Sequence, residues 1–143
     1  MKTTMKKRLE FDAGHRLMHH ESKCRNLHGH RYVVEVTIEL EAEAALDLAG
    51  RIVDFSDVKA LLGEWIDDTL DHACIVNAAD KALVDYLGAE ALKHFVVGFE
   101  PSAENLAAFI LERAAHLLDV PGARHVSGVV LFETPTSSAE VRA

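Results

Sequence analysis

The sequence predicts an α+β fold in which two helices pack on one face of a four-stranded antiparallel sheet. Residues 7–15 and 28–40 alternate between apolar and polar side chains, as half-buried strands do. Residues 54–70 and 101–120 instead repeat their apolar side chains at helical spacing. Valine-rich segments that are too short for helices follow, so the expected order is two strands, two helices and two strands. One domain spanning residues 1–143 accommodates this order.

The first two strands place histidines on their apolar faces. Leu9, Phe11, Ala13 and His15 fall on one face of the first strand. His28 and His30 share a face with the apolar positions of residues 32–40 in the second strand. Side chains at i and i+2 of a strand share a face. If the two strands pair as antiparallel neighbours, the three imidazoles meet.

The helices are predicted from their apolar spacing and their caps. Asp54 or Ser56 can cap the helix over residues 54–70. The longer helix over residues 101–120 opens with a proline and the capping residue Ser102, and it stops at a Pro-Gly pair.

The remaining segments complete the expected fold. Shorter helical pieces are expected in residues 78–95, with a break at Gly88, and a short strand is expected over residues 94–99. Residues 125–134 are predicted to form a strand, and residues 137–143 are predicted to form a final edge strand.

Composition restricts the class of partner. The net charge of −8 argues against nonspecific binding to nucleic acid or membranes, and no apolar run long enough to span a bilayer occurs. The start lacks the apolar stretch of a signal peptide, so a soluble, cytoplasmic protein is expected. Cys24 and Cys74 form no CxxC motif, which fits a reducing compartment. Residues 1–31 carry a net charge of +5, which suits either an anionic small molecule or ordinary solvent-facing strand charges.

The three inward histidines predict a metal site. A lone histidine on an apolar face is usually a hydrogen-bonded core residue, but three buried imidazoles without partners would leave several nitrogens unsatisfied. Three neutral nitrogen ligands leave a fourth tetrahedral position open, as in catalytic zinc sites, so Zn²⁺ is preferred over iron or nickel. His19 and His20 are alternative ligands, but adjacent residues of an extended segment face opposite ways.

Cys24 is a candidate catalytic thiol. It lies in the expected turn between the first two strands, and the charges of Lys23 and Arg25 favour its thiolate. Such a thiolate can act as a base or as a nucleophile, although a free loop cysteine is the plainer interpretation. Cys74 lies in a more apolar segment and is expected to serve packing.

Six motifs cover nearly the whole chain: FDAGH at 11–15, CRNLHGH at 24–30, RIVDFSDVK at 51–59, LDHACIVN at 70–77, PSAENL at 101–106 and FET at 132–134. Together and in this order they resemble the family of 6-pyruvoyltetrahydropterin and 6-carboxytetrahydropterin synthases. The resemblance implies the tunnelling fold, in which four-stranded sheets join edge to edge into barrels. It also implies homo-oligomers, commonly hexamers, with active sites between subunits.

The resemblance assigns roles to individual residues. It implies three zinc ligands, His15, His28 and His30. It makes Cys24 the residue that abstracts a proton, with Asp71 and His72 as a pair that polarises it or acts as a second acid or base. Without the resemblance, Asp71 and His72 are a capping and loop pair. Cys24 and this pair are expected to meet only between chains.

The resemblance also implies substrate-binding residues. Glu133, at the end of an apolar strand, becomes the anchor for the guanidine-like edge of a pterin, whose two N–H donors suit a carboxylate. Ser102 and Glu104 of the PSAENL motif are assigned to substrate binding as well. Ser102 stands where threonine is common, and residues 78–100 are longer than in minimal members. Both departures bear on the substrate preference.

The implied substrate is the anion 7,8-dihydroneopterin triphosphate, and no glycine motif for a nicotinamide cofactor is present. One branch of the family yields 6-pyruvoyltetrahydropterin on the route to tetrahydrobiopterin. The other yields 6-carboxytetrahydropterin and acetaldehyde for queuosine and 7-deazaguanine synthesis. Three residues separate Cys24 from His28, the spacing typical of the carboxy branch. The alternatives are the pyruvoyl branch, a zinc- or pterin-binding module without turnover, and a related cyclohydrolase or aldolase.

Overall fold

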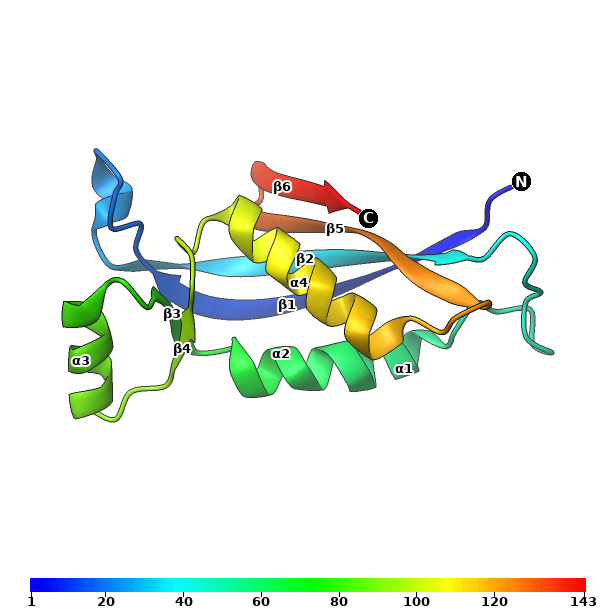
Figure 1. The fold of residues 1–143 in the computed structure, drawn as a ribbon, viewed down its shortest axis with the longest axis horizontal. Helices are drawn as coiled ribbons and strands as arrows, with labels where there is room; N and C mark the ends of the chain where they lie inside the picture. The colour runs from blue at the N-terminus through cyan, green and yellow to red at the C-terminus, as the bar shows by residue number, and fades with distance from the viewer.

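The computed structural model describes residues 1–143, and its elements follow the predicted order (Figure 1). The strands are β1 (Thr4–His15), β2 (His28–Leu40), β3 (Ala73–Asn77), β4 (His94–Val97), β5 (Arg124–Thr134) and β6 (Ser137–Arg142). The helices are the 3₁₀ turn η1 (Lys23–Arg25), α1 (Phe55–Val58), the π-helical η2 (Lys59–Gly63), α2 (Glu64–Thr69), α3 (Lys81–Ala89) and α4 (Ala103–Leu118). None of them combines the length and apolar character that a bilayer crossing requires.

The sheet has six strands rather than the predicted four, in the order β4-β3-β1-β2-β5-β6. The predicted antiparallel part is present, because β1 pairs with β2, β2 with β5, and β5 with β6. The prediction of a purely antiparallel sheet is wrong, since β3 runs parallel to β1 and β4 runs parallel to β3. The two added strands are short and lie beside the end of β1 that carries His15.

The β1–β2 hairpin fixes the register that the alternation predicted. His15 lies opposite His28, Ala13 opposite His30, and Phe11 opposite Tyr32. Phe11 and Tyr32 stack with their ring centroids 5.0 Å apart, directly below the histidines. The histidines at the ends of the two strands therefore lie beside a stacked aromatic pair.

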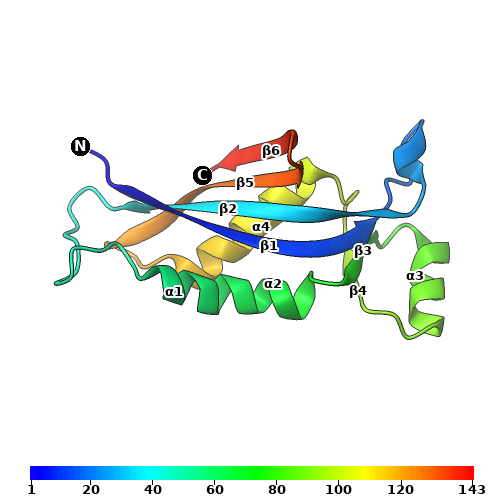
Figure 2. The same ribbon diagram turned by 180° about the vertical axis from the view of Figure 1, so that it is seen from behind.

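Two helical segments share one core with the sheet. The predicted helix over residues 54–70 is continuous through α1, η2 and α2, and Asp54 caps its start by accepting from the Ser56 backbone N–H. Ser102 caps α4, which crosses the sheet diagonally and lies behind the strands when seen from the other side (Figures 1 and 2). The fully buried side chains between them include Tyr32, Val34, Val36, Leu62, Ile66, Leu106, Ile110, Leu118, Val129 and Leu131.

Segment 78–100 forms α3 and β4 at one end of the molecule (Figure 1). The strand predicted over residues 94–99 is present as β4, but the break predicted at Gly88 is absent. Gly88 lies inside α3, where one exposed glycine costs only about 1 kcal/mol relative to alanine. The chain leaves the helix instead at Ala91, whose φ of 52° lies in the left-handed region.

Candidate active site

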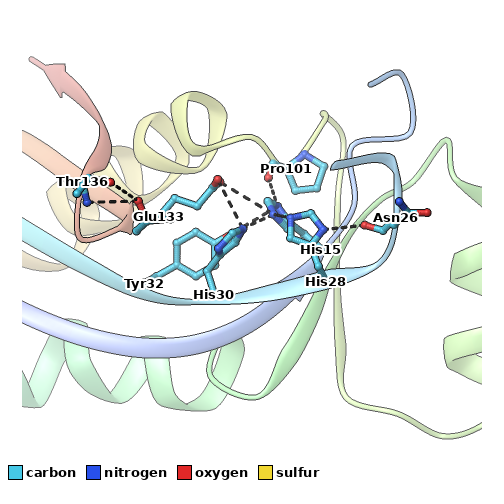
Figure 3. A network of polar contacts seen from close by, with 9 residues as sticks. His15, Asn26, His28, His30, Tyr32, Pro101, Glu133 and Thr136 are labelled. Atoms are coloured by element: carbon cyan, nitrogen blue, oxygen red, sulfur yellow. Dashed lines mark hydrogen bonds and ion pairs between the residues drawn. The ribbon is translucent and has the colours of Figure 1, made fainter. Parts of the chain in front are cut away.

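Three imidazoles converge at the end of the β1–β2 hairpin (Figure 3). Each of His15, His28 and His30 offers a ring nitrogen, and these nitrogens lie within 4.8 Å of one another. The ring centroids are 4.7 to 5.1 Å apart. His15 is 1% exposed, so the trio lies against the core of the sheet. The convergence predicted from strand parity is therefore present.

Backbone carbonyls select the tautomers of two of these rings. His15 Nδ1–H donates to the Pro101 carbonyl at 2.7 Å, and His28 Nδ1–H donates to the Asn26 carbonyl at 2.7 Å. In these tautomers each Nε2 carries a lone pair, and the two Nε2 atoms face one another at 3.2 Å. A backbone partner on the outer nitrogen of a histidine is the usual support of a metal ligand.

His30 supplies the observation that tests the fit of a cation. Its Nε2 atom is buried and has no hydrogen-bond partner. An orphaned buried nitrogen costs about 1–3 kcal/mol, and two facing lone pairs repel one another. A single cation between the three Nε2 atoms removes both costs at once. The donor set therefore fits a metal ion with nitrogen-rich coordination.

Burial favours the neutral form of two of the three imidazoles, which is the form that a metal ion requires. Desolvation lowers the pKa of both His15 and His30. Burial also raises the pKa of Tyr32, whose hydroxyl lies 3.3 Å from His15 Nδ1. The neutral imidazole and the neutral phenol are therefore the forms present near neutral pH.

Glu133 lies beside the trio, at the end of β5 (Figure 3). Its Oε1 is 3.6 Å from His30 Nε2, and its Oε2 is 4.0 Å from His15 Nε2. The side chain is 25% exposed, so the carboxylate is reachable from solvent while it faces the histidines. This placement suits a group that contacts a ligand bound at the trio.

Cys24 lies apart from the three histidines. It belongs to η1, in the loop that joins β1 to β2, and Leu17 N–H donates to its backbone carbonyl at 2.9 Å. Its thiol is partly exposed, makes no hydrogen bond and is not a member of the three-histidine cluster. The structure therefore leaves this thiol available to a reactant.

Asp71 and His72 form a hydrogen-bonded pair between α2 and β3. His72 Nδ1–H donates to Asp71 Oδ2 at 2.7 Å, while Asp71 Oδ1 accepts from the Asp12 backbone N–H at 2.9 Å. The bond from Asp12 is the main reason that the pKa of Asp71 is lowered. His72 has a φ of 59° and its N–H donates to the Asp12 carbonyl, so strained backbone is held in place by β1.

The Asp71–His72 pair shares a cavity with one of the three histidines but is not bonded to any of them. His72 is 75% exposed and lines a cavity of about 640 Å³ together with His30, Asp12, Arg31 and Lys93. No hydrogen bond or ion pair joins the pair to Cys24 or to the trio. The expected contact between Cys24 and this pair is therefore not made inside one subunit.

The other candidate residues lie outside the three-histidine cluster. Ser102 caps α4 directly after Pro101, and Glu104 is exposed in the first turn of the same helix. His19 and His20 lie in the loop and outside the trio, as expected. Cys74 packs partly against a small apolar cluster, and burial raises the pKa of its thiol.

Most of the basic charge near the N-terminus is already paired. Five of its eight basic side chains form ion pairs with carboxylates: Lys2, Lys6, Arg8, Arg16 and Arg31. The interpretation as ordinary strand charges therefore holds for Lys6, Arg8 and Arg31, whereas Lys2 precedes β1 and Arg16 follows it and is paired with the buried Asp80. Lys7, Lys23 and Arg25 form no ion pair, and the last two flank Cys24.

Sequence reasoning missed three supporting groups of the site. The carbonyls of Asn26 and Pro101 orient two imidazoles, and the Tyr32 hydroxyl reaches His15. Tyr32 has the parity of the histidines and could have been found from it. A backbone carbonyl carries no side-chain signal, so the other two had none.

The fold and site define a class of protein: an α+β chain with a cluster of three histidines that could hold a metal ion, beside a carboxylate. A family model described as 6-pyruvoyl tetrahydropterin synthase matches residues 4–143. The chain belongs to this family.

Similar proteins agree on the family. The chain is 38% identical over 136 residues to a 6-carboxy-5,6,7,8-tetrahydropterin synthase of Rickettsia bellii, covering 94% of this chain and 96% of that protein. The protein of the same description from Haemophilus influenzae is 35% identical over 137 residues, with 94% of each chain covered.

Solved structures share the fold. An uncharacterized protein of Wolinella succinogenes superposes with a TM-score of 0.83 at 24% identity, covering 99% of this chain and 98% of that one. The 6-pyruvoyl tetrahydropterin synthase of Caenorhabditis elegans gives a TM-score of 0.70 at 24% identity, covering 100% of this chain and 96% of that one.

Proposed function

We propose that this chain is a zinc-dependent 6-carboxytetrahydropterin synthase. It converts 7,8-dihydroneopterin triphosphate to 6-carboxy-5,6,7,8-tetrahydropterin, acetaldehyde and triphosphate, a step of queuosine and 7-deazaguanine synthesis. The observation that carries the proposal is the trio of imidazoles whose ring nitrogens lie within 4.8 Å of one another, with the His30 Nε2 atom buried and without a hydrogen-bond partner. The spacing of Cys24 to His28 and the description of the Rickettsia and Haemophilus relatives support the carboxy branch.

His15, His28 and His30 would hold the metal ion. Three neutral nitrogen donors favour Zn²⁺, and iron or nickel is the less favoured occupant. When bound, Zn²⁺ acts as a Lewis acid that makes protons next to the substrate's side-chain hydroxyls easier to remove. Glu133 faces this position with both carboxylate oxygens and would accept two N–H groups from the pterin ring. Ser102 and Glu104 would complete the pterin pocket from the start of α4.

Cys24 would take a proton from the substrate side chain. Its thiol has no partner within the chain, and the positive charges of Lys23 and Arg25 beside it would attract the triphosphate. His72 would return a proton through Nε2, because its Nδ1–H is bound to Asp71. Asp71 would fix this tautomer, since its other oxygen is anchored on the β1 backbone.

Assembly would bring these two groups together. No strand pairs with β1 on its outer edge before Ala13, and β6 is the other edge of the sheet. Two open edges in each chain suit edge-to-edge pairing between copies, which removes an aggregation hazard. A homohexamer built from such barrels would place Cys24 of one chain near Asp71 and His72 of another.

The proposal is tested by product analysis of the zinc-loaded protein with 7,8-dihydroneopterin triphosphate. Acetaldehyde released together with a carboxylated pterin, in equal amounts, is the expected result. A pyruvoyl product without acetaldehyde would assign the chain to the 6-pyruvoyltetrahydropterin branch. Binding of the pterin without any turnover would make the chain a binding module and would overturn the enzymatic proposal.

Glu133 offers a separate test of the substrate site. Glu133→Gln keeps the shape of the side chain but loses one acceptor, so the protein should bind a dihydropterin at least about tenfold more weakly. Glu140→Gln, on β6 and paired only with Arg142, is the matched control. Equal binding by both variants would remove Glu133 from the pterin site.

A further inference from the structure

Asn77 ties the segment before Pro101 to the end of β3. Asn77 Nδ2–H donates to Glu100 Oε1 at 3.0 Å, and its Oδ1 accepts from the Ala79 backbone N–H at 3.0 Å. The second oxygen of Glu100 accepts from the His19 backbone N–H at 3.3 Å. Glu100 directly precedes Pro101, whose carbonyl supports His15. The Asn77 amide therefore restrains the position of that carbonyl.

Arg16 links the backbone next to His15, the hydrogen-bond partner of Pro101, to the same turn. Arg16, the residue after His15, donates to both oxygens of Asp80, at 2.5 and 2.6 Å. Asp80 is 5% exposed, so this bidentate pair is made away from most of the solvent. Charge-assisted bidentate pairs of this kind have a fixed geometry. They therefore restrain the backbone next to His15.

Both restraints come from residues 77–80, which begin at the last residue of β3. His15 lies opposite Ile75 where β1 and β3 pair in parallel. The turn is therefore held next to β1 by the backbone pairing of β3. Its side chains bind Arg16 on one side and Glu100 on the other. Arg16, Asn77, Asp80 and Glu100 together form what we name the 77–80 clamp.

We infer that the 77–80 clamp consists of positioning residues for the metal centre: it holds the Pro101 carbonyl against His15 Nδ1 and so keeps His15 Nε2 aimed at the other two ligands. The inference rests on the proposed metal site. It gives segment 78–100 a role, because Asp80 and Glu100 of this segment restrain His15 and the Pro101 carbonyl that orients it. Outer partners of metal ligands typically change metal affinity by 10- to 100-fold.

Exchanging the donor and the acceptor of one clamp bond tests the inference. Asn77→Asp keeps the acceptor for the Ala79 N–H but places a carboxylate against Glu100. Glu100→Gln alone cannot satisfy the donors of both Asn77 and His19. In the double variant, which combines Asn77→Asp with Glu100→Gln, the Gln amide can donate to the introduced carboxylate and still accept from the His19 N–H. The bond is then restored in the reverse direction.

Two measurements report on the clamp without enzyme turnover. Co²⁺ affinity, measured by competition with a chromophoric chelator, should fall about tenfold or more in each single variant and recover to within about threefold in the double variant. Nitrogen NMR of the metal-free protein should show one His15 tautomer in the wild type and the double variant. The single variants should show a mixture of tautomers. Glu41→Gln, which alters a carboxylate bonded to His125, is the control and should change neither measurement.

The outcomes separate this inference from the proposed function. A wild-type protein that binds no Co²⁺ would overturn the metal site itself. A wild type that binds Co²⁺ while every clamp variant binds equally well would overturn only the clamp. If Asn77→Asp does not fold, Glu100→Gln decides by itself, because unchanged Co²⁺ affinity and an unchanged tautomer in that variant contradict the inference.

Discussion

The Nε2 atoms of His15 and His28 lie 3.2 Å apart, although neither carries a hydrogen in the tautomer that its backbone bond selects. Two lone pairs at this distance repel one another unless a cation lies between them. The chain therefore folds its first hairpin around a position that favours positive charge.

Removing one imidazole should abolish specific metal binding. His28→Ala or His30→Ala leaves two nitrogen donors, so the affinity for Zn²⁺ should fall by more than about 100-fold, beyond the loss typical of a supporting residue. Equilibrium competition with a chelator measures this loss. His20→Ala, in the neighbouring loop and outside the trio, should bind as the wild type does. Equal losses in all three variants would contradict the assignment of the ligands.

Metal should stabilise the folded chain. A metal that binds only the folded state raises the free energy of unfolding by about 2.7 kcal/mol at a free concentration 100 times its Kd. Urea unfolding with and without Zn²⁺ measures the shift of the midpoint, and a chelator should reverse it. An unchanged midpoint at saturating Zn²⁺ would contradict binding to the folded protein.

The metal-free protein should lose stability as the pH falls below about 6.5, the ordinary pKa of histidine. Burial lowers the pKa of His15 and of His30 in the folded state, so below this pH the unfolded chain binds more protons. Stability therefore falls with decreasing pH. Urea unfolding at about pH 7.5 and about pH 5.5 tests the sign, because carboxylates do not titrate strongly between these values. Equal or greater stability at the lower pH would contradict this prediction.

Gly29→Ala should distort the ligand strand. A Cβ on Gly29 would lie 3.0 Å from the Ala13 carbonyl oxygen, which belongs to the paired backbone of β1 and cannot turn aside. We expect a loss of about 1–3 kcal/mol in the free energy of unfolding and weaker metal binding. Gly98→Ala is the control, because nothing lies within 4 Å of the added carbon. A Gly29 variant as stable as the control would show that the hairpin absorbs the methyl group.

Cys24→Ala should separate chemistry from metal binding. The thiol makes no hydrogen bond and lies outside the three-histidine cluster, so Zn²⁺ affinity and stability should stay unchanged. Turnover should fall by at least 10²-fold, the lower end of the range for a general base. Metal content and product formation are measured on the same sample. Full activity in the variant would exclude the thiol from the reaction.

The histidine site could be predicted from the sequence because strand parity is a local property. His15, His28 and His30 lie on alternating strands that pair as neighbours, so a period of two brings them together. β3 could not be predicted in the same way. Its five residues pair in parallel and are mostly buried, so they show no alternation. Its place beside His15 depends on contacts between segments about sixty residues apart.

The polar support of the site was also hidden from sequence reasoning. Arg16 and Asp80 are 64 positions apart, and each is an ordinary charged residue in its own segment. Only the parallel pairing of β3 with β1 brings their ends together. Gly88 was misjudged for another reason, because a break was predicted from local propensity alone, whereas packing of Leu83 and Leu87 holds α3 together.

The histidine ligands are confined to one early hairpin, and this has a consequence for the order of events during synthesis. A ribosome that has released residues 1–40 has already made all three imidazoles, whereas Pro101 and Glu133 emerge much later. The three imidazoles are therefore made before the carbonyl that selects the His15 tautomer and before the carboxylate beside them. The final orientation of the His15 ring has to wait until the start of α4 has packed against the hairpin.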